Sequence, residues 1–268
     1  MVIGAVVYKL IAENEASLIE LHGKLLHGAL FAMIKEIDPN ASQRIHNNVG
    51  GKGFSAGLLE PENKKESNGE LTIKSDEKYK WRVCALRDDV LELLISIKPN
   101  SVLKVGNAQF RIEDVVTQNR YGARLIDKRD FVGNDLNYKT IRSVSFHFLT
   151  PGTFRRDDMD YPLPTPELVF GSIAKKWIEN EMPMKIDYKM IKEAATHVKP
   201  FKWEGRSIFG YTAKNCGITG FKGSFTYSLD GLDDEWRKVF FMLGKYSEFA
   251  GVGRLTGQGF GRVKFSWR

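Results

Sequence analysis

The sequence contains little of what disulfide-rich, zinc-binding and membrane-spanning proteins depend on. It has two cysteines in 268 residues, Cys84 and Cys216, and neither has a CxxC or CxxH companion. Neither a disulfide framework nor a zinc site is therefore supported. No apolar stretch approaches the roughly 20 residues that span a bilayer, and residues 1–9 have no basic leader before their apolar run. We therefore expect a cytoplasmic protein without a membrane partner.

Clustered carboxylates are also missing. The densest acidic run, formed by Asp157, Asp158 and Asp160, lies beside Arg155 and Arg156. A solvated turn explains such a run better than a metal site does. We therefore predict no metal and no other cofactor.

Apolar side chains and positive charge are both well represented. Hydrophobic residues make up 42% of the chain and aromatic residues 12%, which is enough to bury real cores and argues against wholesale disorder. The net charge is +7 and the pI is about 9.2. This balance favours a polyanionic partner such as RNA, DNA or an anionic membrane surface.

Apolar periodicity predicts the same order of elements twice, although no repeat is visible in the residues themselves. The first half is expected to hold strands at 2–10, 54–59, 78–85 and 109–117 and helices at 15–37 and 88–97. The second half is expected to hold strands at 143–149, 207–211, 221–227 and 259–267 and helices at 166–180 and 233–249. Each half is β-α-β-β-α-β, so we predict an α+β protein with two tandem ferredoxin-like (RRM-like) domains, at 1–120 and 139–268. Polar residues 121–138 would connect them, and 61–69 would form a hydrophilic loop.

Five glycines fall within eleven positions near the end of the sequence, at Gly251, Gly253, Gly257, Gly259 and Gly261. A helical pattern precedes them and an alternating strand pattern follows. Nucleotide-cofactor loops need the opposite order, with the strand first and the helix last, so a nucleotide-cofactor site is excluded. Glycines at this density indicate that something approaches the main chain closely.

The spacing of this run resembles the C-terminal glycine-rich loop of the RAMP superfamily of CRISPR-associated RNA-binding proteins. Gly-hydrophobic-Gly is followed by five residues that include Arg254 and then by Gly-hydrophobic-Gly again. Within that superfamily the sequence is most similar to the Cas6 family, the endoribonucleases that cut CRISPR precursor RNA. Residues 146–170 and 220–225 resemble the start of the second domain of these proteins and the strand before their last helix. The resemblance implies a metal-independent cut within CRISPR repeat RNA that leaves a 2′,3′-cyclic phosphate and a 5′-OH.

His46 precedes a basic-aromatic-serine sequence at 52–55 and so resembles the family's catalytic histidine. RNA supplies its own nucleophile, the 2′-OH, so the cut needs only a base, an acid and a cation near the crowded phosphorane. Histidine suits proton transfer near neutral pH, and Lys52 can supply the cation. The alternative is a loop histidine beside a solvated lysine.

Some family members carry a catalytic tyrosine on the first helix, and Phe31 stands at the matching spacing here. A phenyl ring cannot transfer a proton, but His27 lies on the same helical face as Phe31. We therefore predict His27 as the third catalytic residue. Of the other histidines, His22 is interpreted as packed and structural, His147 as structural, and His197 as a contact for RNA.

Basic and glycine residues are the predicted RNA contacts. Residues 197–206 interleave Lys199, Lys202 and Arg206 with aromatic side chains, which suits an RNA stem or a stacked unpaired base and equally suits an ordinary hairpin. The other predicted contacts lie in the C-terminal loop and strand: Gly251, Gly253, Arg254, Gly257, Gly259, Gly261, Arg262 and Lys264.

Three functions remain open from the sequence. The first is the repeat endoribonuclease, which could work alone, as a homodimer or with a CRISPR effector complex. The second is a RAMP-type subunit that holds RNA in such a complex without cutting it. The third is an unrelated ferredoxin-like RNA-binding protein, although the aromatic submotifs of an RNA-recognition motif are not evident.

Overall fold

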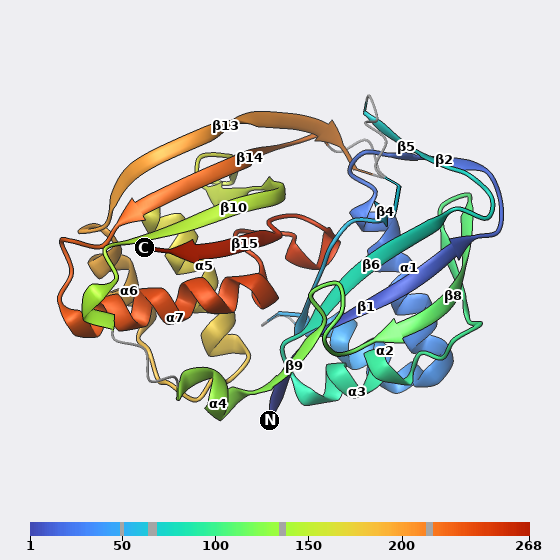
Figure 1. The fold of residues 1–268 in the computed structure, drawn as a ribbon, viewed down its shortest axis with the longest axis horizontal. Coiled ribbons are helices and arrows are strands. Elements are labelled where there is room, and N and C mark those ends of the chain that lie inside the picture. The colour runs from blue at the N-terminus through green and yellow to red at the C-terminus, as the bar shows by residue number, and fades with distance from the viewer. Residues whose placement is uncertain (49–50, 64–68, 134–137, 213–216) are drawn as a thin grey trace. The chain divides into compact units, whose positions relative to one another are not determined.

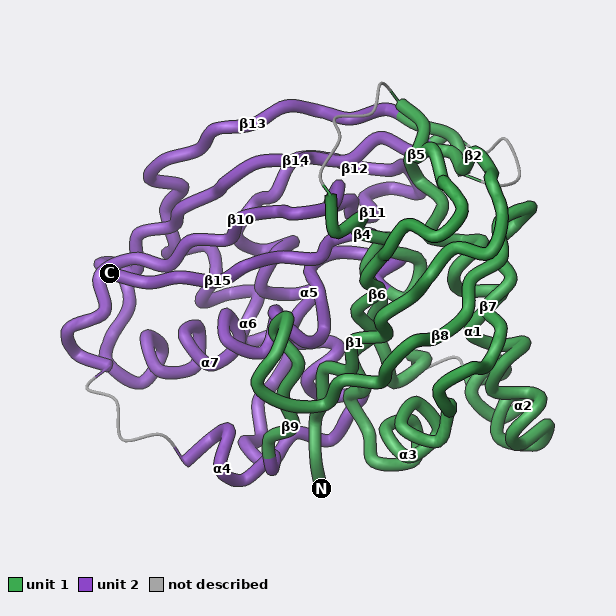
Figure 2. The backbone as a smooth tube through the Cα atoms, turned by 45° about the vertical axis from the view of Figure 1, so that its right-hand side comes forward, with its two compact units in different colours: residues 1–126, 210–217, 257–259 green, residues 127–209, 218–256, 260–268 purple. Residues whose placement is uncertain are grey.

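The computed structural model describes residues 1–48, 51–63, 69–133, 138–212 and 217–268, so Cys216 and most of the predicted loop at 61–69 lie outside the described part. The chain divides into two compact units, which Figure 2 colours separately. Unit 1 comprises residues 1–126, 210–217 and 257–259, and unit 2 comprises residues 127–209, 218–256 and 260–268. Both units combine helices with antiparallel sheets (Figure 1).

Unit 1 is built on a sheet with the strand order β3-β6-β1-β8-β7. These strands are β1 (Val2–Ala12), β3 (Phe54–Ala56), β6 (Lys78–Ala85), β7 (Val102–Val105) and β8 (Ala108–Val116). At the edges, β4 (Glu60–Pro61) pairs with β6 and β9 (Arg124–Asp127) pairs with β1. Central β1 places Tyr8 opposite Trp81 of β6, and both side chains are buried. The strands predicted at 2–10, 78–85 and 109–117 are confirmed.

Three helices belong to this unit: α1 (Gly23–Ile37), α2 (Pro39–Asn47) and α3 (Asp88–Ser96). The Tyr8 hydroxyl donates to the Leu94 carbonyl at 2.8 Å, which fixes α3 to the centre of the sheet. Leu26 and Leu30 of α1 join the same buried core. The predicted helix at 88–97 is thereby confirmed.

The predicted helix at 15–37 is wrong in its first part. Ala16–Ile19 forms a strand, β2, which pairs with β5 (Glu70–Ile73), and α1 begins only at Gly23. The pairing with β5 gives these residues a sheet ladder, and tertiary pairing of this kind overrides weak local propensity. The prediction also missed α2, which Asp38 caps by accepting hydrogen bonds from the main-chain amides of Asn40 and Ala41.

Unit 2 contains a four-stranded sheet with the order β13-β14-β10-β15. Its strands are β10 (Ser143–Gly152), β13 (Lys199–Tyr211), β14 (Gly217–Ser228) and β15 (Val263–Trp267). The smaller elements are α4 (Lys128–Val132), the 3₁₀ turn Tyr138–Thr140, and the hairpin of β11 (Phe154–Arg156) and β12 (Met159–Tyr161). A second 3₁₀ turn, Thr256–Gln258, begins in unit 2 and continues into unit 1. The predicted strand at 207–211 is therefore only the end of a longer strand, and the one predicted at 259–267 starts at Val263. The expected connection at 121–138 contains β9 and α4.

The helices α5 (Pro166–Glu179), α6 (Tyr188–Ala195) and α7 (Asp234–Ala250) complete unit 2. Phe146 of β10 packs against Phe170 of α5 with ring centroids 5.6 Å apart, and Phe170 packs against Phe240 of α7 at 4.4 Å. The alternate residues of β10, such as His147, are exposed on the other face of the sheet. The sheet of unit 2 therefore has one face covered by helices and one open face.

Each unit follows the order β-α-β-β-α-β in its main elements. In both sheets the second, third, first and fourth of these strands lie side by side, as β3-β6-β1-β8 and β13-β14-β10-β15. This is the ferredoxin-like arrangement, so the predicted fold class is confirmed. No helix of the described residues is both long and apolar enough to cross a membrane.

Candidate active site

The side chain of His27 is partly buried on α1 and is held in one orientation. Its Nδ1 lies 2.9 Å from the carbonyl oxygen of Gly257, a residue of the same compact unit. A carbonyl oxygen only accepts hydrogen bonds, so Nδ1 must carry the proton, and Nε2 of the neutral ring is left as an acceptor. Burial lowers the pKa of His27, the bond to Gly257 opposes this, and the nearby charges of Lys52 and His46 lower the pKa further.

Phe31 joins His27 to His46. The ring centroids of His27 and Phe31 are 4.9 Å apart, and the Phe31 ring meets that of His46 edge-on at 5.5 Å. On the other side, the His27 ring stacks on Phe54 at 5.6 Å. The structure therefore brings the two histidines predicted to be catalytic into contact with the same aromatic ring.

His46 lies beside this ring, and Lys52 contacts the main chain of His46. His46 is exposed in the last turn of α2, so it belongs to a helix and not to a loop. The ammonium group of Lys52 donates a hydrogen bond to the main-chain carbonyl of His46. This contact holds a positive charge at the main chain of the last turn of α2. Two residues between them, 49–50, lie outside the described part of the chain.

His22 has the structural position that the sequence predicted. It is 2% exposed, its Nδ1 donates to the Ile19 carbonyl at 3.0 Å, and its Nε2 accepts from the Leu59 amide at 3.0 Å. Burial lowers the pKa of His22 to about 4. The neutral ring thereby ties the start of α1 to the segment after β3.

The two remaining histidines are both exposed in unit 2. His147 lies on the open face of the sheet, where its Nδ1 is 2.7 Å from the Ser224 hydroxyl. It is therefore not a core residue, because its position in β10 alternates with the buried aromatic ones. His197 lies between α6 and β13, at the start of the predicted RNA-binding stretch.

The first two glycines of the C-terminal run and the last one are approached by the protein itself. Gly251, Gly253 and Gly261 all have positive φ, at 68°, 82° and 63°. A Cβ at Gly253 would collide with the Thr153 carbonyl, and one at Gly261 would collide with the Val252 carbonyl. These positions therefore require glycine for the fold, before any RNA is considered.

The amides of this loop are also occupied. Those of Val252 and Gly253 donate to the Gly261 carbonyl at 2.8 Å and to the Ser172 hydroxyl at 2.9 Å. Those of Arg254 and Gly261 donate to the carbonyls of Thr153, at 2.8 Å, and Pro151, at 2.9 Å. None of these four amides is left over to bind a phosphate in this conformation.

Gly257 and Gly259 lie in unit 1, against the candidate active site. A Cβ on Gly257 would lie 3.3 Å from the Phe54 ring and 3.6 Å from Nδ1 of His27. A Cβ on Gly259, where φ is 84°, would lie 2.5 Å from the Leu58 side chain. The second half of the glycine run thus forms one wall beside His27.

Lys176 was missed by sequence reasoning. It lies on α5, and its ammonium group donates to the carbonyls of Gly253 at 2.7 Å and Gly251 at 3.2 Å. Burial lowers its pKa to about 7. With Ser172 one helical turn earlier, Lys176 fixes the start of the glycine run. The only signal in the sequence for a buried role of Lys176 was its position on the apolar face of a predicted helix.

The predicted basic RNA contacts fall into two groups. Arg254 forms an ion pair with Asp160, so this carboxylate does not belong to a solvated turn. Arg262 is partly buried, and burial lowers its pKa. The others are exposed and remain available to RNA: Lys199, Lys202, Arg206 and Lys264. Within the described residues, no group of three or more His, Cys, Asp and Glu side chains could hold a metal ion.

Comparison with known proteins connects this chain to one family. The family model described as CRISPR-associated endoribonuclease Cas6 matches residues 146–263, and the model described as CRISPR-associated protein Cas6, N-terminal, matches residues 19–116. None of the curated proteins matches the sequence.

Solved structures resemble the whole chain. The Cas6 (TTHA0078) product complex is 22% identical over 99% of this chain and 100% of that one, with a TM-score of 0.76. Thermus thermophilus Cas6 (TTHB231) is 21% identical over 98% of each chain, with a TM-score of 0.73. The product of a Cas6-related gene from Pyrococcus furiosus is 14% identical over 98% of each chain, with a TM-score of 0.61.

Proposed function

Because the chain belongs to the Cas6 family of RAMP-type CRISPR-associated proteins, we propose that it cuts CRISPR precursor RNA within the repeats by a metal-independent transesterification. The 2′-oxygen attacks the adjacent phosphorus and the bond to the 5′-oxygen breaks. One product ends in a 2′,3′-cyclic phosphate and the other begins with a 5′-OH. The contacts of His27 and His46 with Phe31, and of Lys52 with the main chain of His46, carry this proposal.

His27 is the general base in this scheme. Its Nδ1–H is committed to the Gly257 carbonyl, so Nε2 is the atom that takes the proton from the 2′-OH. Burial, which lowers the pKa of His27, favours the neutral ring that a base requires. Phe31 packs beside the imidazole, where it restricts the ring and does not compete for the proton.

His46 is the general acid, and Lys52 stabilises the developing negative charge. The exposed His46 ring is free to reach a bound RNA, and its imidazolium gives a proton to the departing 5′-oxygen. His27 takes up one proton and His46 gives up one proton, so the total number of bound protons does not change. After each turnover, proton exchange with water returns both rings to their starting states. The ammonium of Lys52 stays near the phosphorane because it is bound to the His46 carbonyl.

RNA binding is supported by the exposed cations of unit 2 and by the relatives. Solved structures similar to this chain include a product complex and a substrate mimic complex of Cas6 (TTHA0078). Lys199, Lys202, Arg206 and Lys264 would contact phosphates, whereas the ion-paired Arg254 would contribute less. The alternative is a RAMP-type subunit that binds RNA without cutting it, and the paired histidines argue against it.

The test uses purified protein and the repeat RNA encoded beside its own gene, in buffer containing EDTA. We expect one cut per repeat and a 3′ end that resists a phosphatase until the cyclic phosphate is opened. A repeat with a 2′-deoxy nucleotide at the cut site is the matched control and should remain intact. Tight binding without cleavage would support the binding subunit, and a requirement for added metal would refute the mechanism.

A further inference from the structure

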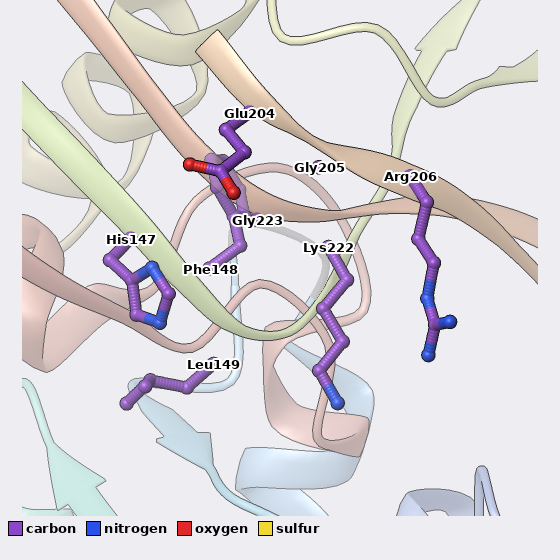
Figure 3. A pocket seen from close by; sticks show the side chains of 8 residues that line it. All are labelled: His147, Phe148, Leu149, Glu204, Gly205, Arg206, Lys222 and Gly223. Atoms are coloured by element: carbon purple, nitrogen blue, oxygen red, sulfur yellow. The ribbon is translucent and has the colours of Figure 1, made fainter.

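A pocket of about 520 Å³ opens on the uncovered face of the unit 2 sheet (Figure 3). Its lining comes from three adjacent strands, with His147 and Leu149 on β10, Glu204 and Arg206 on β13, and Lys222 on β14. We propose that this pocket binds one unpaired guanine nucleotide of the RNA and so contributes to substrate choice. This inference rests on the proposed function, because that function brings RNA to the protein.

Two of the residues that line the pocket are glycines. Gly205 of β13 and Gly223 of β14 lie against each other, and a Cβ on Gly205 would lie 2.5 Å from the Lys222 carbonyl. A Cβ on Gly223 would collide with the Glu204 carbonyl. The close approach of the two strands therefore requires both glycines, and neither of them adds a side chain to the lining of the pocket.

Glu204 provides the group that would read the base. Its carboxylate is exposed and makes no hydrogen bond or ion pair with any residue that the structure describes, although two cations lie in the same pocket. In Figure 3 the carboxylate is turned to the same side as the His147 imidazole. That ring is held by its 2.7 Å contact with the Ser224 hydroxyl, and an imidazole face is a good platform for a stacked base.

The chemistry of a carboxylate selects guanine among the four bases. The Watson–Crick edge of guanine presents two neighbouring N–H donors, N1–H and N2–H, which match the two oxygens of a carboxylate. Adenine and cytosine offer one amino group each beside a ring nitrogen that repels the second oxygen. Uracil presents carbonyl oxygens on both sides of its single N–H. A guanine is therefore the base that Glu204 fits best.

Arg206 and Lys222 would bind the phosphate of the same nucleotide. Both are exposed, and their side chains extend along the side of the pocket away from His147 in Figure 3. Within the described part of the chain neither cation has an ion-pair partner. Phosphate contacts of this kind position a nucleotide, and base contacts give the preference for one base.

The test measures fluorescence polarisation with labelled hexauridine and with hexamers that carry one guanosine, inosine, adenosine or cytidine. We expect the guanosine hexamer to bind about tenfold more tightly than hexauridine, in the range of one bidentate base contact. Inosine, which lacks the N2 amine, should bind with intermediate affinity. The guanosine hexamer should also shift the NMR signals of the His147 ring.

Three variants separate the parts of the pocket. Glu204→Gln should remove the preference for guanosine, because an amide offers only one acceptor oxygen, whereas Lys222→Ala should weaken all hexamers alike. Glu193→Gln, which neutralises an exposed carboxylate on α6, is the matched control and should keep the preference. Equal affinity for all wild-type hexamers, or a preference that survives in Glu204→Gln, would overturn the assignment. Cleavage of the repeat in EDTA is measured independently. If the protein cuts RNA but shows no preference for guanosine, the guanine assignment is wrong and the proposed endoribonuclease function stands.

Discussion

Acidification should destabilise unit 1 through protonation of His22, a buried histidine that has no proposed catalytic role. The buried ring needs its neutral form, because Nε2 accepts from the Leu59 amide while Nδ1 donates to the Ile19 carbonyl. Protonation of Nε2 would turn an acceptor into a donor that faces another donor. The cost falls at the start of α1, the helix that carries His27.

The size of the effect follows from the two pKa values. Burial lowers the pKa of His22 to about 4 in the folded protein, against about 6.5 for a histidine in an unfolded chain. Between these values the unfolded state binds the proton and the folded state does not, so the free energy of unfolding falls as the pH falls through this window. At about 1.4 kcal/mol for each pKa unit, the loss reaches roughly 3 kcal/mol near pH 4 and levels off just below it. A chain of this length would melt about 6 to 12 °C lower.

Thermal unfolding at several pH values between about 7.5 and 4 would measure this loss. His22→Gln should be less stable than wild type near neutral pH, but its melting temperature should fall less steeply with acid. His197→Gln, which removes an exposed imidazole from unit 2, controls for the loss of a histidine as such. Wild type and His22→Gln curves that run parallel over the whole range would refute the reasoning, because carboxylates common to both proteins would then explain the entire slope.

Three further outcomes are expected. Gly261→Ala should lower the melting temperature by several degrees, because its methyl group meets the Val252 carbonyl and its φ is positive, at a cost of at least about 1 kcal/mol; calorimetry showing no change would contradict this. Lys176→Met should destabilise unit 2 by about 1 to 3 kcal/mol in urea unfolding, because it leaves two loop carbonyls unsatisfied. Lys202→Ala should reduce the salt slope of repeat binding by about 0.7 to 0.9, and the ion-paired Arg254→Ala should reduce it less; equal slopes for the two variants would remove the distinction.

The local parts of the fold could be predicted from the sequence. Alternating apolar residues placed β1, β6 and β8, and the acidic start and apolar period placed α3. The strand β2 could not be placed in the same way, because its hydrogen bonds come from β5, and the residue pair Ser17 and Thr72 is distant in sequence. The helix α2 had a usable signal in Asp38 followed by Pro39, a cap and a first helical residue, which the prediction passed over.

The candidate site shows the same limit. The helical period alone placed His27 beside Phe31, and the two rings are in contact. The partner of His27, the carbonyl of Gly257, is separated from it by 230 positions, so no local pattern could assign the ring's tautomer. The glycine run predicted that something approaches its main chain closely. No local pattern could show that the approaching atoms belong to the protein itself. The catalytic roles themselves stay predictions.

The rate of a single turnover on repeat RNA in EDTA tests the central proposal most directly. His46→Ala should cut at least about 100-fold more slowly than wild type, in the range expected for losing general acid catalysis, while its affinity for the repeat changes little. Gln43→Ala, which changes an exposed residue of α2, should cut at the wild-type rate. His27→Ala should also be slow, and the wild-type rate should fall with acid only below the ordinary histidine range, because the pKa of His27 is lowered. If His46→Ala cuts the repeat at the wild-type rate, the proposed active site is contradicted.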